Sequence, residues 1–292
     1  MDRLRISGPR SLAYVPQYAG MATGRFADRS IDVHLHEVQG TLEDVVGVLN
    51  RGEADLLLGS CLYGLRLSQT GIDPVVVAQL NQRTRHVIAR REGAGPMDWA
   101  DLRGKTIVVC PDKLPTHWAA FTYALHKAGL DLGDVKLAFG YIAEDAIAEF
   151  IRGVGDVLYI DGELAARDGL EIGLRVSAQT GNLPWSVYMA DRRFIAEKRP
   201  LFARFAAALD SAQKWVEAES AETVAQAVAP FFPQFTPEGL LAMIANYKRL
   251  DMWAPQSAVQ RDQLQRWSEG LRLVGFLPPG RELTDYLEIL TD

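Results

Sequence analysis

Apolar and polar residues along the first two thirds of the chain follow the pattern of strands and helices in α/β proteins. The apolar run from Thr106 to Cys110 lies between breakers, which is typical of a strand buried on both faces. A short loop and an amphipathic helix that stops at Gly129 follow it. Similar runs predict strands at 4–7, 31–38, 54–58, 75–80, 135–139 and 157–160, with helices at 11–24, 41–51 and 143–152. This alternation predicts mostly parallel sheets flanked by helices.

The pattern changes after Tyr188, where only helical periodicity remains. Helices are expected at 191–198, 200–219, 221–229, 237–250 and 256–274. Chain crossings near 81–85 and 183–188 divide the chain into two lobes, with a ligand cleft between them. Lobe one is expected to comprise 1–83 plus 189–292, and lobe two 84–188.

Several segments resemble one known family. DLRGKTIVV, followed by a helix opening with TH and by AGLDLGDVK, is similar to the second lobe of type II periplasmic substrate-binding proteins. YVPQYAGMATGRFADRSIDVHLHEVQG, LNRGEADLLLGS and LPWSVYMADRRFIAEKRPLFARFAAALDSAQKWV resemble their first lobe. The group most similar is that of the nitrate, sulfonate, taurine and thiamine-precursor (pyrimidine) binding proteins of ABC importers. The resemblance implies a two-lobed fold that closes around a small anionic or aromatic/heteroaromatic molecule and delivers it to a membrane permease.

Composition limits the possible partners. The formal charge is -6 and no basic cluster occurs, which argues against nucleic acid. No stretch reaches the ~20 apolar residues that span a bilayer. No metal, phosphate-loop or dinucleotide fingerprint is present, so no cofactor is expected. Nothing in the pattern requires self-association, and a monomer is expected.

The compartment has two interpretations. The first expected strand begins at Leu4 and no apolar segment precedes it. Either a leader has been removed and the protein is periplasmic or membrane-associated, or the chain is natively leaderless and cytoplasmic.

Ligand contacts are expected where parallel strands end and helices begin. The residues at these positions, and at the second crossing, are Arg10, Ser11, Tyr14, Ser60, Cys61, Tyr63, Asn81, Thr116, His117, Trp118, Tyr159, Asp161, Asn182, Trp185 and Tyr188. The resemblance implies that Ser11, Ser60, Thr116 and His117 occupy positions where relatives surround a sulfonate, phosphate or carboxylate. Ser11 and Thr116 could instead be helix caps, and Trp118 and Trp185 could be core residues.

Asp161 and Glu163 lie just beyond a strand and could recognise an amine or an aromatic N–H, or could cap the following helix. Many sulfonate-binding relatives have a tryptophan-glutamate-proline-like motif here, whereas this chain has YIDGE. The departure weighs against a simple alkylsulfonate. The aromatic residues of the expected cleft favour an aromatic or pyrimidine-like ligand.

An enzyme on the same fold is the main alternative, with a desulfinase-, decarboxylase- or pyrimidine-synthase-like reaction on an aromatic or heteroaromatic substrate. Its candidate catalytic residues are Cys61, His117 and Arg10. Two isolated cysteines do not reproduce the cysteine cluster of the pyrimidine synthase. Binding is therefore favoured over catalysis, and a cytoplasmic sensor is a third alternative.

Overall fold

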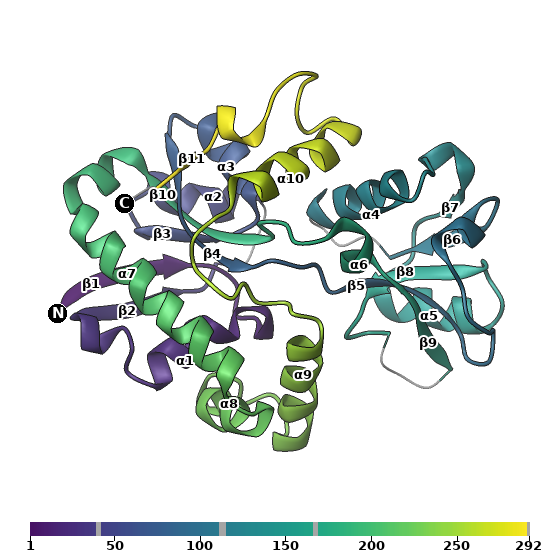
Figure 1. Cartoon of the computed structure of the whole chain (residues 1–292), viewed down its shortest axis with the longest axis horizontal. Coiled ribbons are helices and arrows are strands. Elements are labelled where there is room, and N and C mark those ends of the chain that lie inside the picture. The colour runs from purple at the N-terminus through teal and green to yellow at the C-terminus, as the bar shows by residue number, and fades with distance from the viewer. Residues whose placement is uncertain (39–41, 111–114, 166–168, 291–292) are drawn as a thin grey trace. The chain divides into compact units, whose positions relative to one another are not determined.

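The computed structural model describes residues 1–38, 42–110, 115–165 and 169–290 (Figure 1). Two compact units are distinguished within the chain. Unit 1 contains Met1–Arg83, Leu183–Trp267 and Arg281–Asp292, and unit 2 contains Thr84–Asn182 and Ser268–Gly280. Each unit has its own sheet, so each is described by itself.

Unit 1 is built on a six-stranded sheet in the order β11-β4-β10-β3-β1-β2. β1 runs parallel to β2 and β3, and β11 runs parallel to β4, whereas β10 is antiparallel to both of its neighbours. The strands are β1 (Asp2–Ser7), β2 (Ile31–His36), β3 (Leu56–Gly59), β4 (Pro74–Asn81), β10 (Ser186–Asp191) and β11 (Glu288–Ile289).

The alternation of β1 shows how the sheet of unit 1 is buried. Leu4 and Ile6 point into the main hydrophobic core, because side chains of a strand face opposite sides in turn. Arg5 points the other way and forms an ion pair with Asp55 at 2.6 Å. β3 and β4 are buried along their whole length, as the apolar runs predict.

Helices of unit 1 cover both faces of its sheet. α1 (Val15–Ala22) packs against the long α7 (Arg192–Ala218), and Phe205 of α7 reaches the same core as Leu4. α7 is bent at Lys198, two residues before Pro200, since a proline inside a helix removes a backbone hydrogen bond. The other helices are α2 (Leu42–Asn50), α3 (Cys61–Ser68), α8 (Ala221–Val228), α9 (Pro237–Arg249) and the first part of α10 (Arg261–Leu273).

Unit 2 has a five-stranded sheet in the order β7-β6-β8-β5-β9. β6 runs parallel to β7 and β8, and β5 is antiparallel to β8 and β9. The strands are β5 (His86–Arg91), β6 (Thr106–Val109), β7 (Lys136–Ala138), β8 (Val157–Asp161) and β9 (Leu170–Arg175), and the helices are α4 (Pro115–Lys127), α5 (Ala143–Ile151) and α6 (Val176–Thr180).

The two faces of the unit 2 sheet have different roles. Leu158 and Ile160 of β8 pack with Phe150 of α5 in an apolar core. Tyr159 lies between them in sequence, so it faces the other side. There its ring lies 4.7 Å from that of Phe121 in α4. The α4 face is therefore the aromatic side of this sheet.

The predicted α/β, two-lobed class of fold is confirmed, and its sheets are mixed because β5 and β10 run against their neighbours. Relative to the predicted lobe boundaries, the units assign residues 183–188 to unit 1 and residues 268–280 to unit 2. Residues 183–188 continue the unit 1 sheet, since the Leu183 amide donates to Gln82 and the Trp185 amide to Asn81.

The entry to β8 provides a test of this packing. Gly155 has φ +68°, and a Cβ there would lie 2.7 Å from Val108 and 3.2 Å from the Thr106 carbonyl oxygen of β6. Gly104 has φ +75° with open space around it. We expect Gly155→Ala to lower the free energy of unfolding by about 1–3 kcal/mol more than Gly104→Ala, because only the first also overpacks the strand. Denaturant titration of both variants measures the difference, and equal losses would contradict the close approach of the two strands.

Candidate functional site

The carboxyl ends of β1 and β3 meet at one edge of the unit 1 sheet. Ser7 ends β1, and Ser60 follows β3 and caps α3 by accepting a hydrogen bond from the Leu62 amide at 3.2 Å. Val187 of the antiparallel β10 pairs with Gly59, so Ser186 also lies at this edge, beside Asn81 at the end of β4. All four polar side chains are buried. This edge therefore gathers three hydroxyls and one amide.

Two polar atoms of this edge have unused hydrogen-bonding capacity. The Ser7 hydroxyl and the Asn81 Oδ1 are buried and have no hydrogen-bond partner within the described part of the chain. The Asn81 amide nitrogen donates to the Ser186 hydroxyl at 3.4 Å. Buried polar groups are rarely left unpaired, so both atoms are suited to hydrogen-bond a bound molecule. Ser7 and Ser186 were not among the predicted contacts, although Ser7 is the last residue of β1 and Ser186 is the first residue of β10.

Arg10 and Ser11 follow β1 as predicted. Nε and Nη2 of Arg10 both donate to Oε1 of Glu37, at 2.7 and 2.5 Å, and Nη1 donates to the Phe231 carbonyl. Ser11 caps the turn Leu12–Tyr14 by accepting from the Ala13 amide at 3.1 Å. The Arg10 charge is thus already balanced by a carboxylate, and Ser11 has the capping role considered as its alternative.

Cys61 is fully buried at the first position of α3. Its thiol donates to the Pro184 carbonyl at 3.3 Å. Burial raises the pKa of the Cys61 thiol to about 12. A thiol in this state is protonated at neutral pH and is a poor nucleophile.

The predicted aromatic contacts of unit 1 lie at different depths in its interior. Tyr188 is in the main core, where its hydroxyl donates to Gln17 Oε1 at 2.9 Å, and burial raises its pKa well above the usual value. Trp185 is packed 5.8 Å from Trp267. Tyr14 and Tyr63 are buried close to the ends of β1 and β3, at 8% and 6% exposure.

Unit 2 has a comparable edge, formed by the carboxyl ends of β6 and β8 and by the start of β5. His86 pairs with Asp161 across β5 and β8, and its ring stacks on that of His117 with centroids 4.0 Å apart. Tyr159 lies beneath, with its hydroxyl donating to the His117 carbonyl at 2.7 Å. This bond fixes the first turn of α4 on the sheet. Burial, with the charges of His117 and Arg85, lowers the pKa of His86 well below its usual value.

Asp161 and Glu163 share one arginine at this edge. Nε of Arg85 lies 2.5 Å from Asp161 Oδ2 and 3.7 Å from Glu163 Oε1. Asp161 also accepts a hydrogen bond from the Glu163 amide at 3.0 Å. Burial raises the pKa of Glu163 to about 7, against the opposing effect of Arg85 and with a smaller contribution from Asp161. The carboxyl group of Glu163 is therefore only partly compensated.

The remaining predicted contacts of unit 2 are Thr116, Asn182 and Trp118. Thr116 is buried in the first turn of α4, and Asn182 is partly exposed at the end of the unit's first segment. Trp118 is partly exposed, with Phe121 at 5.5 Å and Phe139 at 5.8 Å. Phe139 is 54% exposed although it is a large apolar residue. It directly follows β7, so it adds an aromatic surface that was not among the predicted contacts.

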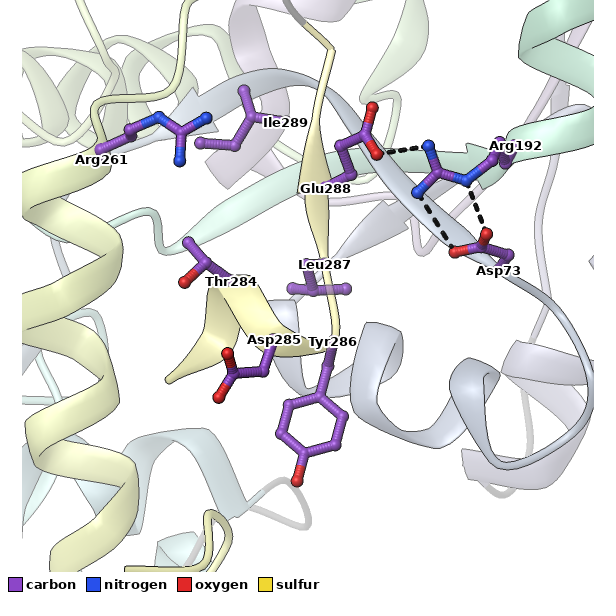
Figure 2. A pocket seen from close by; sticks show the side chains of 9 residues that line it. All are labelled: Asp73, Arg192, Arg261, Thr284, Asp285, Tyr286, Leu287, Glu288 and Ile289. Atoms are coloured by element: carbon purple, nitrogen blue, oxygen red, sulfur yellow. Dashed lines mark hydrogen bonds and ion pairs between the residues drawn. The ribbon is translucent and has the colours of Figure 1, made fainter. Parts of the chain in front are cut away.

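A small pocket of about 220 Å³ lies elsewhere in unit 1 (Figure 2). Figure 2 shows Arg192 between Asp73 and Glu288, with which it forms ion pairs. The pocket lies beside the start of β4, whereas Asn81 ends that strand. It contains none of the predicted contacts. The ion pairs of Arg192 with Asp73 and Glu288 link the start of α7 to the residue before β4 and to the C-terminal strand β11.

No group of three or more histidine, cysteine, aspartate or glutamate side chains within the described ranges could hold a metal ion. His34 and His36, which share one strand face, have Asp32 and Glu53 as their respective neighbours. No helix in the described part of the chain is long and apolar enough to cross a membrane.

Comparison with known proteins assigns the family. A family model described as NMT1/THI5 like matches residues 12–223. The chain belongs to the NMT1/THI5-like family. The prediction that it falls within the substrate-binding protein group of ABC importers is confirmed at the level of family and fold.

Individual relatives are distant in sequence. YtlA of Bacillus subtilis (strain 168), named as a candidate binding protein, is 24% identical over 92% of this chain and 82% of its own. The periplasmic aliphatic sulphonate binding protein SsuA of Escherichia coli is 16% identical with a TM-score of 0.76, covering 98% of this chain and 97% of its own. The periplasmic nitrate-binding protein NrtA of Synechocystis PCC 6803 is 12% identical with a TM-score of 0.70, covering 95% and 83%. The two structures share the fold.

The protonation state of Cys61 can be tested directly. We expect Cys61 to resist iodoacetamide in the native protein at about pH 8, because only the thiolate reacts and the side chain is buried. Peptide mass spectrometry with and without denaturant measures the labelling. Labelling of native Cys61 as fast as in the denatured chain would contradict the burial and restore it as a nucleophile.

Glu163 makes stability depend on pH. Its pKa is about 7 in the folded protein and 4.5 for an unperturbed glutamate, so the folded state binds more protons between these values. The contribution of Glu163 to the free energy of unfolding therefore falls as pH rises from 4.5 to about 7 and stays low above it.

We expect Glu163→Gln to gain stability relative to the wild type across this range. Denaturant titration in steps of pH measures the difference, and Glu92→Gln serves as the control because Glu92 is exposed at the opposite end of β5. A difference for Glu163→Gln that does not change with pH would contradict the raised pKa.

Proposed function

We propose that the chain is the solute-binding protein of an ABC-type importer and that it captures a small aromatic or heteroaromatic molecule. The supporting observation is that each unit carries an edge of buried polar groups beside aromatic rings. The unit 1 edge has Ser7, Ser60, Ser186 and Asn81, and the unit 2 edge has His86 and His117 above Tyr159. Apolar walls with a few convergent polar groups are typical of small-molecule sites.

The composition of these edges favours a flat ligand over a simple inorganic anion. Arg10 and Arg85, which lie near the edges, each have a carboxylate partner. Binding of nitrate or an alkylsulfonate would compete with those carboxylates for the same guanidinium groups. Stacking against Trp118 or Phe139 and hydrogen bonding to hydroxyls require no such exchange.

Chemistry at these edges has less support than binding. The only cysteine among the predicted catalytic residues, Cys61, is buried and protonated. Arg10 is tied to Glu37. Binding without chemistry suits transport, and we infer that the protein delivers its ligand to a membrane permease.

The test is thermal unfolding in the presence of pyrimidines, aromatic acids, sulfonates and nitrate. A ligand at a hundred times its dissociation constant adds about 2.7 kcal/mol, which raises the midpoint by about 2–4 °C per kcal/mol for a chain of this size. We expect a pyrimidine or another flat heteroaromatic to raise the midpoint and to be recovered unchanged by chromatography. A ligand that is consumed would establish an enzyme instead, and no response from any compound would contradict the proposed ligand class.

The same assay with a variant locates the site. His117→Ala should remove most of the midpoint shift, because His117 is in the first turn of α4 at the unit 2 edge. His126→Ala is the matched control, since His126 belongs to the same helix and is paired with Glu269 away from that edge. Equal shifts in both variants would place the ligand elsewhere.

A further inference from the structure

The charge balance around Arg85 indicates what the ligand brings to unit 2. One guanidinium faces two carboxylates, and the closer one, Asp161, is held at 2.5 Å. Asp161 also accepts a hydrogen bond from the Glu163 backbone amide, so it has a second hydrogen-bond donor besides Arg85. Within the described residues, the one ion-pair contact of Glu163 is that with Arg85 at 3.7 Å. When both carboxyl groups are ionised, these three side chains together carry one negative charge.

The carboxyl group of Glu163 is only partly exposed to water. The Glu163 side chain is 31% exposed, and burial rather than the neighbouring Asp161 is the main reason that its pKa is raised. A carboxylate in such a place is stabilised by a donor or a cation. Among the described residues, the charged groups beside it are Arg85, which directly precedes β5, and Asp161 of β8. The titratable rings of His86 and, from α4, His117 lie beyond Arg85. His86 supplies no charge, because burial keeps its ring neutral.

A second observation at the same edge also indicates a missing partner. Nδ1 of His86 is buried and has no hydrogen-bond partner within the described residues, and the side chain is 2% exposed. The ring stacks on His117 and lies 5.3 Å from the ring of Tyr159, and both contacts favour its buried orientation. A bound molecule with both a ring and hydrogen-bonding nitrogens would supply partners to His86 and Glu163 together.

We propose that Glu163 selects the ligand by accepting hydrogen bonds from a cationic, amidine-like N–H group on a flat ring. This inference rests on the proposed binding function and narrows its ligand class. A charge-assisted hydrogen bond to such a group is short and strong, and it offsets the net negative charge of Arg85, Asp161 and Glu163. A carboxylate or sulfonate at the same position would meet like charge from Glu163 and Asp161, which disfavours it.

Isothermal titration calorimetry with benzamidine and benzoate tests the inference, because the two probes share a ring and differ in the sign of the charged group. We expect wild-type protein to bind benzamidine at least about tenfold more tightly than benzoate. Glu163→Gln should weaken benzamidine binding by about tenfold or more, and Glu92→Gln should leave it unchanged. Tighter binding of benzoate, or an undiminished affinity in Glu163→Gln, would overturn the inference.

A wild-type measurement covers the case in which Glu163→Gln does not fold. Benzamidine keeps its charge over the working range, so its affinity should rise about tenfold between about pH 5.5 and about pH 8.5 as Glu163 ionises. A flat profile would overturn the inference.

The two proposals fail in different ways. If neither probe binds but another ring compound raises the thermal midpoint, the amidine assignment is wrong and the binding function stands. If no compound raises the midpoint, both are wrong.

Discussion

Burial of the central strands on both faces is the constraint on which the rest of this structure depends. β3 and β4 are buried along their whole length, and β6 and β8 at all but one residue each, so these strands are built mainly from leucine, isoleucine and valine. Polar side chains are therefore concentrated where the strands end. Because parallel strands end together, serines, histidines and carboxylates from distant parts of the sequence meet at one edge in each unit.

The same burial determines the charge states of these edges. Removing a group from water disfavours its charged form, which keeps the Cys61 thiol, the Tyr188 phenol and the His86 ring neutral. Charges persist only in pairs, as for Arg10 with Glu37 and Arg85 with Asp161. Among the described residues Glu163 is the exception, since the cation beside it, Arg85, lies closer to Asp161. An edge of this kind holds polar atoms at fixed positions, as recognition of a small molecule requires.

Sequence reasoning predicted several of the residues that lie at the two edges, because strand ends can be inferred from apolar runs and breakers. Ser60, Thr116, His117, Tyr159 and Asp161 all lie at the edges for that reason. It missed Ser7, His86, Ser186 and Phe139, which also lie at strand ends or starts. His86 could have been found, since a polar residue that begins a buried strand directly after a chain crossing has to face the same edge.

The sequence by itself determined the α/β class, the family and the order of the elements, because hydrophobic periodicity and turn residues are local properties. Only the tertiary structure decided which charges are balanced and which side chains are buried. Three contacts join residues that are far apart in sequence: Arg10 with Glu37, Cys61 with Pro184, and Arg85 with Asp161. Each contact affects the charge or the hydrogen bonding of the residues that it joins. Electrostatics and solvation depend on distances in space, and those distances arise only when the sheets form.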